Sequence, residues 1–206
     1  MSEDFISQDY MNRLFQYLKF NPDHAQAHYN LGVALARHGR GEEAEMAFRR
    51  ALELAPQMVE AHINMAGVFF QRGEVEQALA EARLAVEKRP DAALTHCNLG
   101  FLLARAGRRP EARAALEQAI AIQPNMVQAH VNLGQLLLAD GQPAEARQAF
   151  QQALAVQPGL AMANYNLAVI CLQLGEKESA RAHLEAARQA GFVVDPELTR
   201  QVEDGD

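Results

Sequence analysis

A six-residue pattern recurs along the chain at a constant spacing of 34 residues. Its five copies begin at Ala27, Ala61, Thr95, Ala129 and Ala163, and each has asparagine in its fourth position. A fixed period of this length is typical of stacked supersecondary units that contact mainly their neighbours. The period therefore argues against a globular domain built around one central core.

Proline and glycine recur with the same period. The prolines are Pro22, Pro56, Pro90, Pro124 and Pro158, and the glycines are Gly39, Gly73, Gly107, Gly141 and Gly175. Both residue types interrupt regular structure, so each unit has two breaks. The segments between breaks each fit one helix and a short turn, which predicts a helix-turn-helix unit. The glycine after each first helix is expected in a left-handed backbone conformation.

The small and apolar positions of the unit resemble the signature of the tetratricopeptide repeat (TPR) family. In the first unit they are Leu31, Gly32, Leu35, Ala44, Phe48, Ala51 and Pro56. The second unit departs slightly, with Ala66 and Ala82 among its signature residues, and the fifth lacks the proline. The resemblance implies an all-α fold: a right-handed TPR superhelix, or α-solenoid, of five helix-turn-helix repeats with N- and C-terminal capping helices.

This interpretation divides the chain into a cap, five repeats and a second cap. The expected ranges are 1–24 for the N-terminal capping helix, 25–58, 59–92, 93–126, 127–160 and 161–192 for the repeats (25–192 together), and 193–206 for the C-terminal capping helix and tail. Within the first cap, Tyr10, Leu14 and Leu18 recur at helical spacing. In the second, Asp195 is the expected N-cap of a short helix that covers the fifth repeat with Leu198 and Val202.

Composition narrows the function. The net charge of −7 argues against a nucleic-acid binder, which needs a basic surface. No apolar run approaches the ~20 residues that span a membrane, and no signal pattern opens the sequence, so we expect a soluble cytoplasmic protein without membrane insertion. Catalytic and nucleotide-binding motifs are absent, which predicts a non-catalytic protein without cofactors.

Histidine also recurs once per repeat, as His28, His62, His96 and His130. Equivalent residues of stacked helices should lie roughly 10 Å apart, given interaxial distances of 8–10 Å. Metal–nitrogen bonds of about 2 Å cannot join side chains at that spacing. We therefore predict no metal site and interpret the histidines as packing residues.

The first helices carry a second apolar face, and in the TPR family first helices line a concave groove. Three rows lie on this face: Tyr29, Ile63, Cys97, Val131 and Tyr165; Val33, Gly67, Phe101, Gln135 and Val169; and Ala36, Phe70, Ala104, Leu138 and Leu172. Exposed apolar patches of this size usually mark binding sites. The alternatives are that neighbouring repeats bury part of these rows, or that a terminus occupies the groove.

The asparagines of the repeated pattern lie beside these rows, and the helix propensity of asparagine is too low to explain five of them. Each side chain offers one acceptor and two donors, enough to hold a peptide unit. The series resembles the asparagine ladder in the TPR domain of O-linked N-acetylglucosamine transferase, which implies binding of an extended peptide backbone. The alternative is that the asparagines fix the pitch of the superhelix.

These observations favour an adaptor that binds an extended, partly apolar segment of a partner protein, with Arg37 and Arg105 pairing with acidic groups. The predicted peptide-binding residues are Asn30, Asn64, Asn98, Asn132, Asn166, Tyr29, Ile63, Phe70, Phe101, Val131, Tyr165, Arg37 and Arg105. A second hypothesis is a scaffold that forms homo-oligomers through Phe5, Tyr10, Phe15 and the C-terminal helix. A third is a regulatory subunit of a separately encoded enzyme such as a glycosyltransferase.

Overall fold

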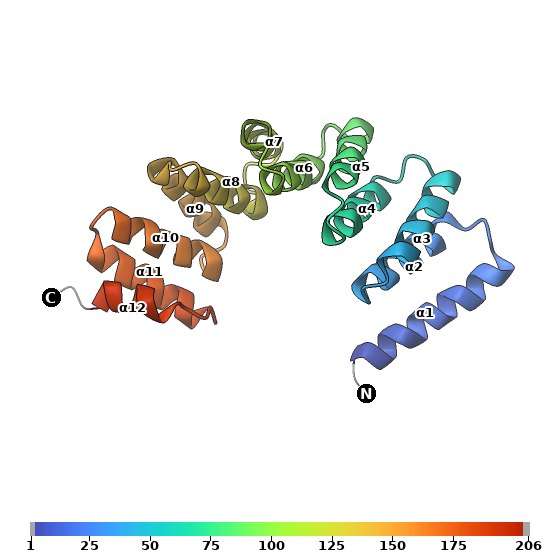
Figure 1. Ribbon diagram of the computed structural model, residues 1–206, viewed down its shortest axis with the longest axis horizontal. Coiled ribbons are helices and arrows are strands. Elements are labelled where there is room, and N and C mark those ends of the chain that lie inside the picture. Colours follow the sequence, from blue (N-terminus) through green and yellow to red (C-terminus); the bar gives the residue numbers. More distant parts are fainter. Residues whose placement is uncertain (1–2, 204–206) are drawn as a thin grey trace. The chain divides into compact units, whose positions relative to one another are not determined.

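The structure is a computed structural model that describes the backbone of residues 3–203 and the side chains of residues 8–202. Its described part consists of twelve helices and contains no strand (Figure 1). The helices are α1 (Glu3–Phe20), α2 (Ala25–Arg37), α3 (Gly41–Leu54), α4 (Val59–Gln71), α5 (Val75–Lys88), α6 (Ala93–Arg105), α7 (Arg109–Ile122), α8 (Val127–Ala139), α9 (Pro143–Val156), α10 (Ala161–Gln173), α11 (Lys177–Gln189) and α12 (Pro196–Glu203). The predicted all-α class, with helices that pack in consecutive pairs, is confirmed.

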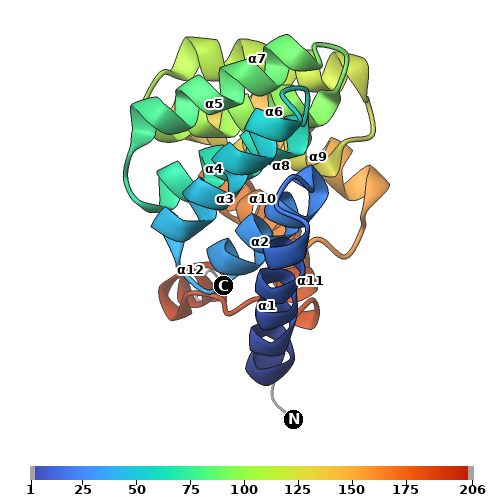
Figure 2. The ribbon, with the colours of Figure 1, turned by 90° about the vertical axis from the view of Figure 1, so that its right-hand side faces the viewer.

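The chain divides into two compact units, one ending at Ala106 and the other beginning at Gly107. In the N-terminal unit, α2 packs on α3 and α4 on α5, and each pair contacts the next helix along the chain. In the C-terminal unit the pairs are α8 with α9 and α10 with α11. Both views show α1 lying along α2, which it contacts (Figures 1 and 2).

The repeating glycines end the first helices as predicted. Gly39 has φ +71° and its four equivalents lie between +70° and +78°, in the left-handed region where a side chain would be strained. The Gly39 amide donates to the Ala36 carbonyl at 3.0 Å, and the Arg40 amide donates to that of Leu35 at 3.0 Å. These are the two hydrogen bonds of a Schellman motif, and they satisfy carbonyls that the helix end leaves open.

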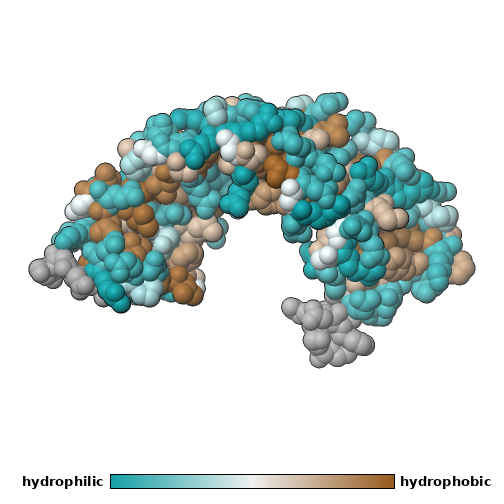
Figure 3. Space-filling model, in the orientation of Figure 1, coloured by the Kyte–Doolittle hydropathy of each residue, from teal (hydrophilic) through white to brown (hydrophobic). Residues whose placement is uncertain are grey.

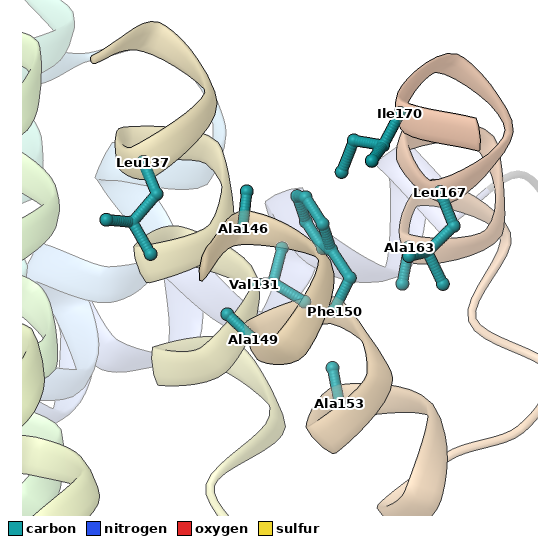
Figure 4. Packing of buried hydrophobic residues seen from close by; sticks show 9 residues of the cluster. All are labelled: Val131, Leu137, Ala146, Ala149, Phe150, Ala153, Ala163, Leu167 and Ile170. Atoms are coloured by element: carbon teal, nitrogen blue, oxygen red, sulfur yellow. The ribbon is translucent and has the colours of Figure 1, made fainter. Parts of the chain in front are cut away.

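Glycine inside the first helices serves another purpose. A Cβ added to Gly32 would lie 2.7 Å from the Phe48 ring, and one added to Gly134 would lie 2.8 Å from the Phe150 ring. Both rings are fully buried. In Figure 4, Phe150 lies among Val131, Ala146 and Ile170. The glycine therefore makes room for an aromatic ring of the second helix rather than for a second backbone.

The terminal helices cover apolar faces. In α12, Leu198 and Val202 pack against buried residues of α10 and α11, and Asp195 accepts a hydrogen bond from the Glu197 amide at 2.9 Å, as the sequence predicts. Among the side chains of α1 that the structure describes, Met11 and Leu18 are buried, whereas Tyr10 is 46% exposed. Of the predicted stripe, Leu18 is thus buried and Leu14 is half-buried, whereas Met11 rather than Tyr10 packs against the neighbouring helix.

Ion pairs link successive repeats. Arg72 at the end of α4 contacts Glu45 of α3 at 2.6 Å, and Arg147 of α9 contacts Glu176 before α11 at 2.7 Å. The hydrogen bond from Arg147 lowers the pKa of Glu176, although its partial desolvation opposes that shift. These pairs lie between second helices and the following turns, so they fix the stacking of neighbours without using the apolar face of the first helices.

Candidate functional site

The predicted peptide-binding residues are distributed over both units. Those of the N-terminal unit are Tyr29, Asn30 and Arg37 of α2, Ile63, Asn64 and Phe70 of α4, and Asn98, Phe101 and Arg105 of α6. Those of the C-terminal unit are Val131 and Asn132 of α8, and Tyr165 and Asn166 of α10. All of them lie on first helices, and the two groups differ in what surrounds them.

Four of the five asparagines bond to a residue one turn earlier in their own helix. Asn30 accepts from the side-chain amide of Gln26 at 3.0 Å, and Asn132 accepts from that of Gln128 at 2.9 Å. The side-chain amides of Asn64 and Asn166 donate to the carbonyls of Glu60 and Met162, each at 2.9 Å. Such local bonds satisfy part of the hydrogen-bonding capacity of each side chain and leave the rest open.

Asn64 has a further partner outside its helix. Its amide also donates to the hydroxyl oxygen of Tyr29 at 2.9 Å, which links α4 to α2. The Tyr29 ring in turn packs on Phe48, with ring centroids 5.9 Å apart. This asparagine therefore contributes to the packing of the first two repeats, as in the alternative interpretation of the ladder.

Asn98 differs from the other four. Its half-buried side chain makes no hydrogen bond with any residue in the described part of the chain. It borders a cavity of about 150 Å³ in the N-terminal unit. The acceptor and both donors of Asn98 are thus open beside a hollow, which is the arrangement that binding of a peptide unit requires.

The cavity is apolar and is lined by residues of α4, α5 and α6. Besides Asn98 it is lined by Ile63, Ala66, Gly67, Phe70, Ala82, Ala85, Thr95, Phe101 and Leu102. The rings of Phe70 and Phe101 meet edge to face, with centroids 5.6 Å apart, and Phe101 is 38% exposed. Four predicted binding residues, Ile63, Phe70, Asn98 and Phe101, thus surround one hollow.

The second repeat has this cavity because its packing residues are small. Position 82 holds alanine, whereas the equivalent residues of the other repeats are Phe48, Leu116, Phe150 and Leu184. Ala82 is 2% exposed and faces no large side chain from Ala66, which replaces Gly32 of the first repeat. The methyl groups of Ala66 and Ala82 fill less space than the ring of Phe48 in the first repeat, so a cavity remains beside α5. The sequence shows Ala82, but the resulting cavity was not predicted.

A second hollow of about 250 Å³ adjoins the first. It is lined by Val33, Ala36, Arg37, Asn64, Gly67, Val68 and Gln71, so Gly67 borders both. Arg37 and Arg105 are exposed, and of the arginines in the described part of the chain they are the two whose side chains form no ion pair or hydrogen bond. An unpaired guanidinium beside a hollow is available to a carboxylate from outside.

The corresponding surface of the C-terminal unit is more enclosed. Val131 is 5% exposed and belongs to a buried cluster with Ala163 and Leu167, and Asn132 is 8% exposed. Tyr165 packs against Phe192, with ring centroids 4.8 Å apart. In the N-terminal unit, Cys97 is buried as well. Part of the first apolar row is therefore covered by neighbouring helices, whereas Ile63 borders an open cavity.

Two wider hollows are less suited to an apolar ligand. One, of about 540 Å³, is bordered by Arg40, Glu43 and Arg72, and the other, of about 410 Å³, by Arg113 and Glu145 among others. Arg40 pairs with Glu43 at 2.6 Å, and Arg113 pairs with Glu145 at 2.8 Å. Their charged groups already have partners, so these hollows present polar surface between salt bridges.

The repeated histidines have a role that sequence reasoning missed. The Nε2 atoms of His28, His96 and His130 lie 2.8, 2.8 and 2.7 Å from the carbonyl oxygens of Pro22, Pro90 and Pro124. His62 instead bonds Glu81 through Nδ1 at 2.7 Å. The constant distance of six residues from proline to histidine was the available signal. No cluster of His, Cys, Asp and Glu in the described residues has metal-binding geometry.

Comparison with known proteins agrees with this architecture. Three family models described as tetratricopeptide repeats match the chain: one over residues 91–159, one over 38–96, and one over 12–59 and 132–191, which is more than half of the sequence. The search of curated proteins returned no match. In the described part of the chain, no helix combines the length and apolar character needed to cross a membrane.

Solved structures show the same fold. pilF of Pseudomonas aeruginosa is 26% identical, with a TM-score of 0.79 over 86% of this chain and 80% of that protein. PilW, described as a type IV pilus biogenesis factor, is 21% identical, with a TM-score of 0.78 over 88% and 87%. YrrB, described as a TPR protein with an unusual peptide-binding site, is 21% identical, with a TM-score of 0.67 over 93% and 97%. Together with the matching family models, these similarities establish that the chain belongs to the tetratricopeptide repeat family.

Proposed function

We propose that the chain is a non-catalytic adaptor that binds an extended, partly apolar segment of a partner protein on the first helices of its N-terminal unit. One observation carries the proposal: the unpaired amide of Asn98 borders an apolar cavity whose rim includes the exposed ring of Phe101. Membership of the TPR family supports an interaction role, since its members are typically interaction modules. YrrB, which shares the fold, is described as having a peptide-binding site.

The asparagines contribute differently to peptide binding in this proposal. Asn98 holds a peptide unit of the ligand directly, because no described residue occupies its donors and acceptor. Asn30 and Asn64 use their remaining capacity, since each also bonds within its own helix. Stacked first helices place equivalent residues roughly 10 Å apart. An extended chain advances at most about 3.3–3.6 Å per residue, so successive asparagines meet about every third peptide unit.

The proposal is tested by selection from a random library. Phage displaying random twelve-residue peptides are selected on the full chain, and the enriched peptides are measured by fluorescence anisotropy. The variant Asn98→Ala should bind them about two- to tenfold more weakly, because a hydrogen bond to a neutral partner contributes about 0.5–1.5 kcal/mol. Its circular dichroism and melting temperature should match those of the parent. Failure to enrich any peptide, or equal binding by Asn98→Ala, contradicts this function.

A specific observation also favours self-assembly. Along α1, Tyr10, Phe15, Tyr17 and Phe20 are exposed, Phe20 by 84%. Figure 3 shows apolar atoms at the surface of the N-terminal unit among hydrophilic ones. Phe5, which belongs to the same hypothesis, lies outside the described side chains. Light scattering after size-exclusion chromatography distinguishes the two functions: a monomer that Phe20→Ser leaves unchanged excludes assembly through α1. A cytoplasmic location and a partnership with a separate enzyme remain predictions.

A further inference from the structure

We infer that the cavity of the second repeat receives one large apolar side chain of the partner segment, phenylalanine or leucine, and that an acidic residue beside it pairs with Arg37. The inference rests on the proposed function and specifies its ligand: a short acidic segment with one bulky anchor.

The cavity lies where two packing positions of the second repeat hold alanine. In the first and fourth repeats a glycine faces a phenylalanine ring that fills the space between two helices, as for Gly32 with Phe48. The second repeat has Ala66 and Ala82 at these positions, and both line the cavity. The missing ring belongs to the chain's own packing pattern, so a ring supplied by a ligand restores contacts that other repeats make internally.

The size and the lining of the cavity suit one large apolar side chain. A volume of about 150 Å³ is comparable to that of an apolar cavity that stays dry and binds benzene. The walls supply Phe70 and Phe101, already edge to face with ring centroids 5.6 Å apart, and a third ring prefers the same geometry. Thr95, the polar wall residue besides Asn98, donates its hydroxyl to the Ala92 carbonyl at 2.7 Å. The wall therefore favours an apolar occupant and offers polar contact only at Asn98.

A ligand can approach the cavity over Gly67 of α4. A Cβ added to Gly67 would meet no heavy atom within 4 Å, so space is open above this residue of α4. Gly67 borders both the apolar cavity and the hollow that contains Arg37. A peptide backbone that passes over Gly67 places one side chain in the cavity and the next ones toward Arg37.

Two unpaired arginines near the cavity favour an acidic ligand. The other arginines of the described part of the chain have intramolecular partners, as Arg72 does with Glu45 and Glu74, whereas Arg37 and Arg105 have none. Arg105 lies four residues after Phe101 on α6, which places it on the same side of the helix one turn later. The unpaired cations thus flank the aromatic rim, and a partner segment with aspartate or glutamate near its anchor complements them.

The test closes the cavity with the chain's own packing. The double variant Ala66→Gly/Ala82→Phe reproduces the glycine–phenylalanine pair of the first and fourth repeats. Among peptides selected on the parent, those with phenylalanine or leucine near an acidic residue should bind this variant at least ~10-fold more weakly, since burial of such a side chain is lost. The matched control Ala168→Gly/Leu184→Phe introduces the same glycine–phenylalanine pair in the fifth repeat, where leucine is replaced, and should bind them as the parent does.

A second variant guards against misfolding. Gly67→Leu occupies the cavity mouth from the surface, where no neighbour lies within 4 Å of its Cβ, and should give the same loss of binding. Arg37→Gln should weaken peptides that carry the acidic residue and leave their uncharged analogues unchanged. Selected peptides without a bulky apolar residue, or full binding by both filled variants, overturn this inference while the proposed function stands. Absence of any selected peptide overturns both.

Discussion

The glycine–aromatic pair of the fourth repeat yields a quantitative prediction. Phe150 is fully buried, so Phe150→Ala removes a ring from the cluster around Ala163 and Leu167 and should cost about 3–5 kcal/mol in free energy of unfolding. In the parent, Gly134→Ala places a methyl group 2.8 Å from that ring, and such overpacking costs about 1–3 kcal/mol. Against this, alanine is about 1 kcal/mol more favourable than glycine inside a helix.

The two changes should therefore be coupled. In the parent, Gly134→Ala is neutral or destabilising by up to about 2 kcal/mol, the difference between overpacking and helix propensity. In the Phe150→Ala background the ring is gone, and the same substitution should stabilise by about 1 kcal/mol. The coupling energy is then about 1–3 kcal/mol and reverses the sign of one substitution.

Urea denaturation followed by circular dichroism measures the four proteins of this cycle. Because repeat proteins can unfold in parts, hydrogen exchange of amides in α8 and α9 provides a local measure of the same free energies. Gly134→Ala that stabilises the parent, or effects that add within about 0.5 kcal/mol, would refute the argument that this glycine makes room for the ring.

Two further predictions concern hydrogen bonds made by the histidines His183 and His130. Burial and, secondarily, the charge of Arg147 lower the pKa of His183 below its ordinary value of 6.5, while His183 Nδ1 lies 3.0 Å from the Asn164 side-chain oxygen. Between the folded pKa and 6.5 the unfolded chain binds more protons, so stability should rise with pH through that window and fall on acidification; denaturation at several pH values should show a weaker dependence in His183→Gln. His130→Ala should lower the free energy of unfolding by about 0.5–1.5 kcal/mol through loss of its bond to the Pro124 carbonyl, whereas His24→Ala, at a position outside this series, should leave the fourth repeat unchanged by hydrogen exchange.

The regular features of the fold were predictable because each has a local cause. Proline and glycine act on their own backbone, so their period predicted the breaks between helices, including the left-handed Gly39. The cap residues Leu198 and Val202 followed from helical spacing alone. At the N-terminal stripe, Tyr10 was expected where Met11 is buried, because both are apolar enough to be buried and only packing against α2 decides between them.

The candidate site was predictable only in part. Periodicity placed Asn98 and Phe101 on one helix face, but it assigns all five asparagines the same role. In the structure, Asn30 and Asn132 each accept from a glutamine, Asn64 and Asn166 each donate to a carbonyl one turn earlier, and Asn98 has no hydrogen-bonding partner among the described residues. The hydrogen bonds of each asparagine depend on residues that do not recur in every repeat, such as Gln26 for Asn30 and Tyr29 for Asn64. The cavity depends on a residue that is absent, the ring that Ala82 lacks, and its shape follows from the positions of three helices.

In the proposed function, a peptide binds on α4 and α6 beside Asn98. The most direct measurement is a titration of the ¹⁵N-labelled full chain with a selected peptide, followed in two-dimensional NMR spectra that include side-chain amides. We expect the side-chain amide resonances of Asn98 and the backbone amide resonances of Gly67 and Phe101 to shift on binding, with saturation at one peptide per chain. Shifts confined to α1 or to the C-terminal unit, with Asn98 unchanged at saturation, would contradict it.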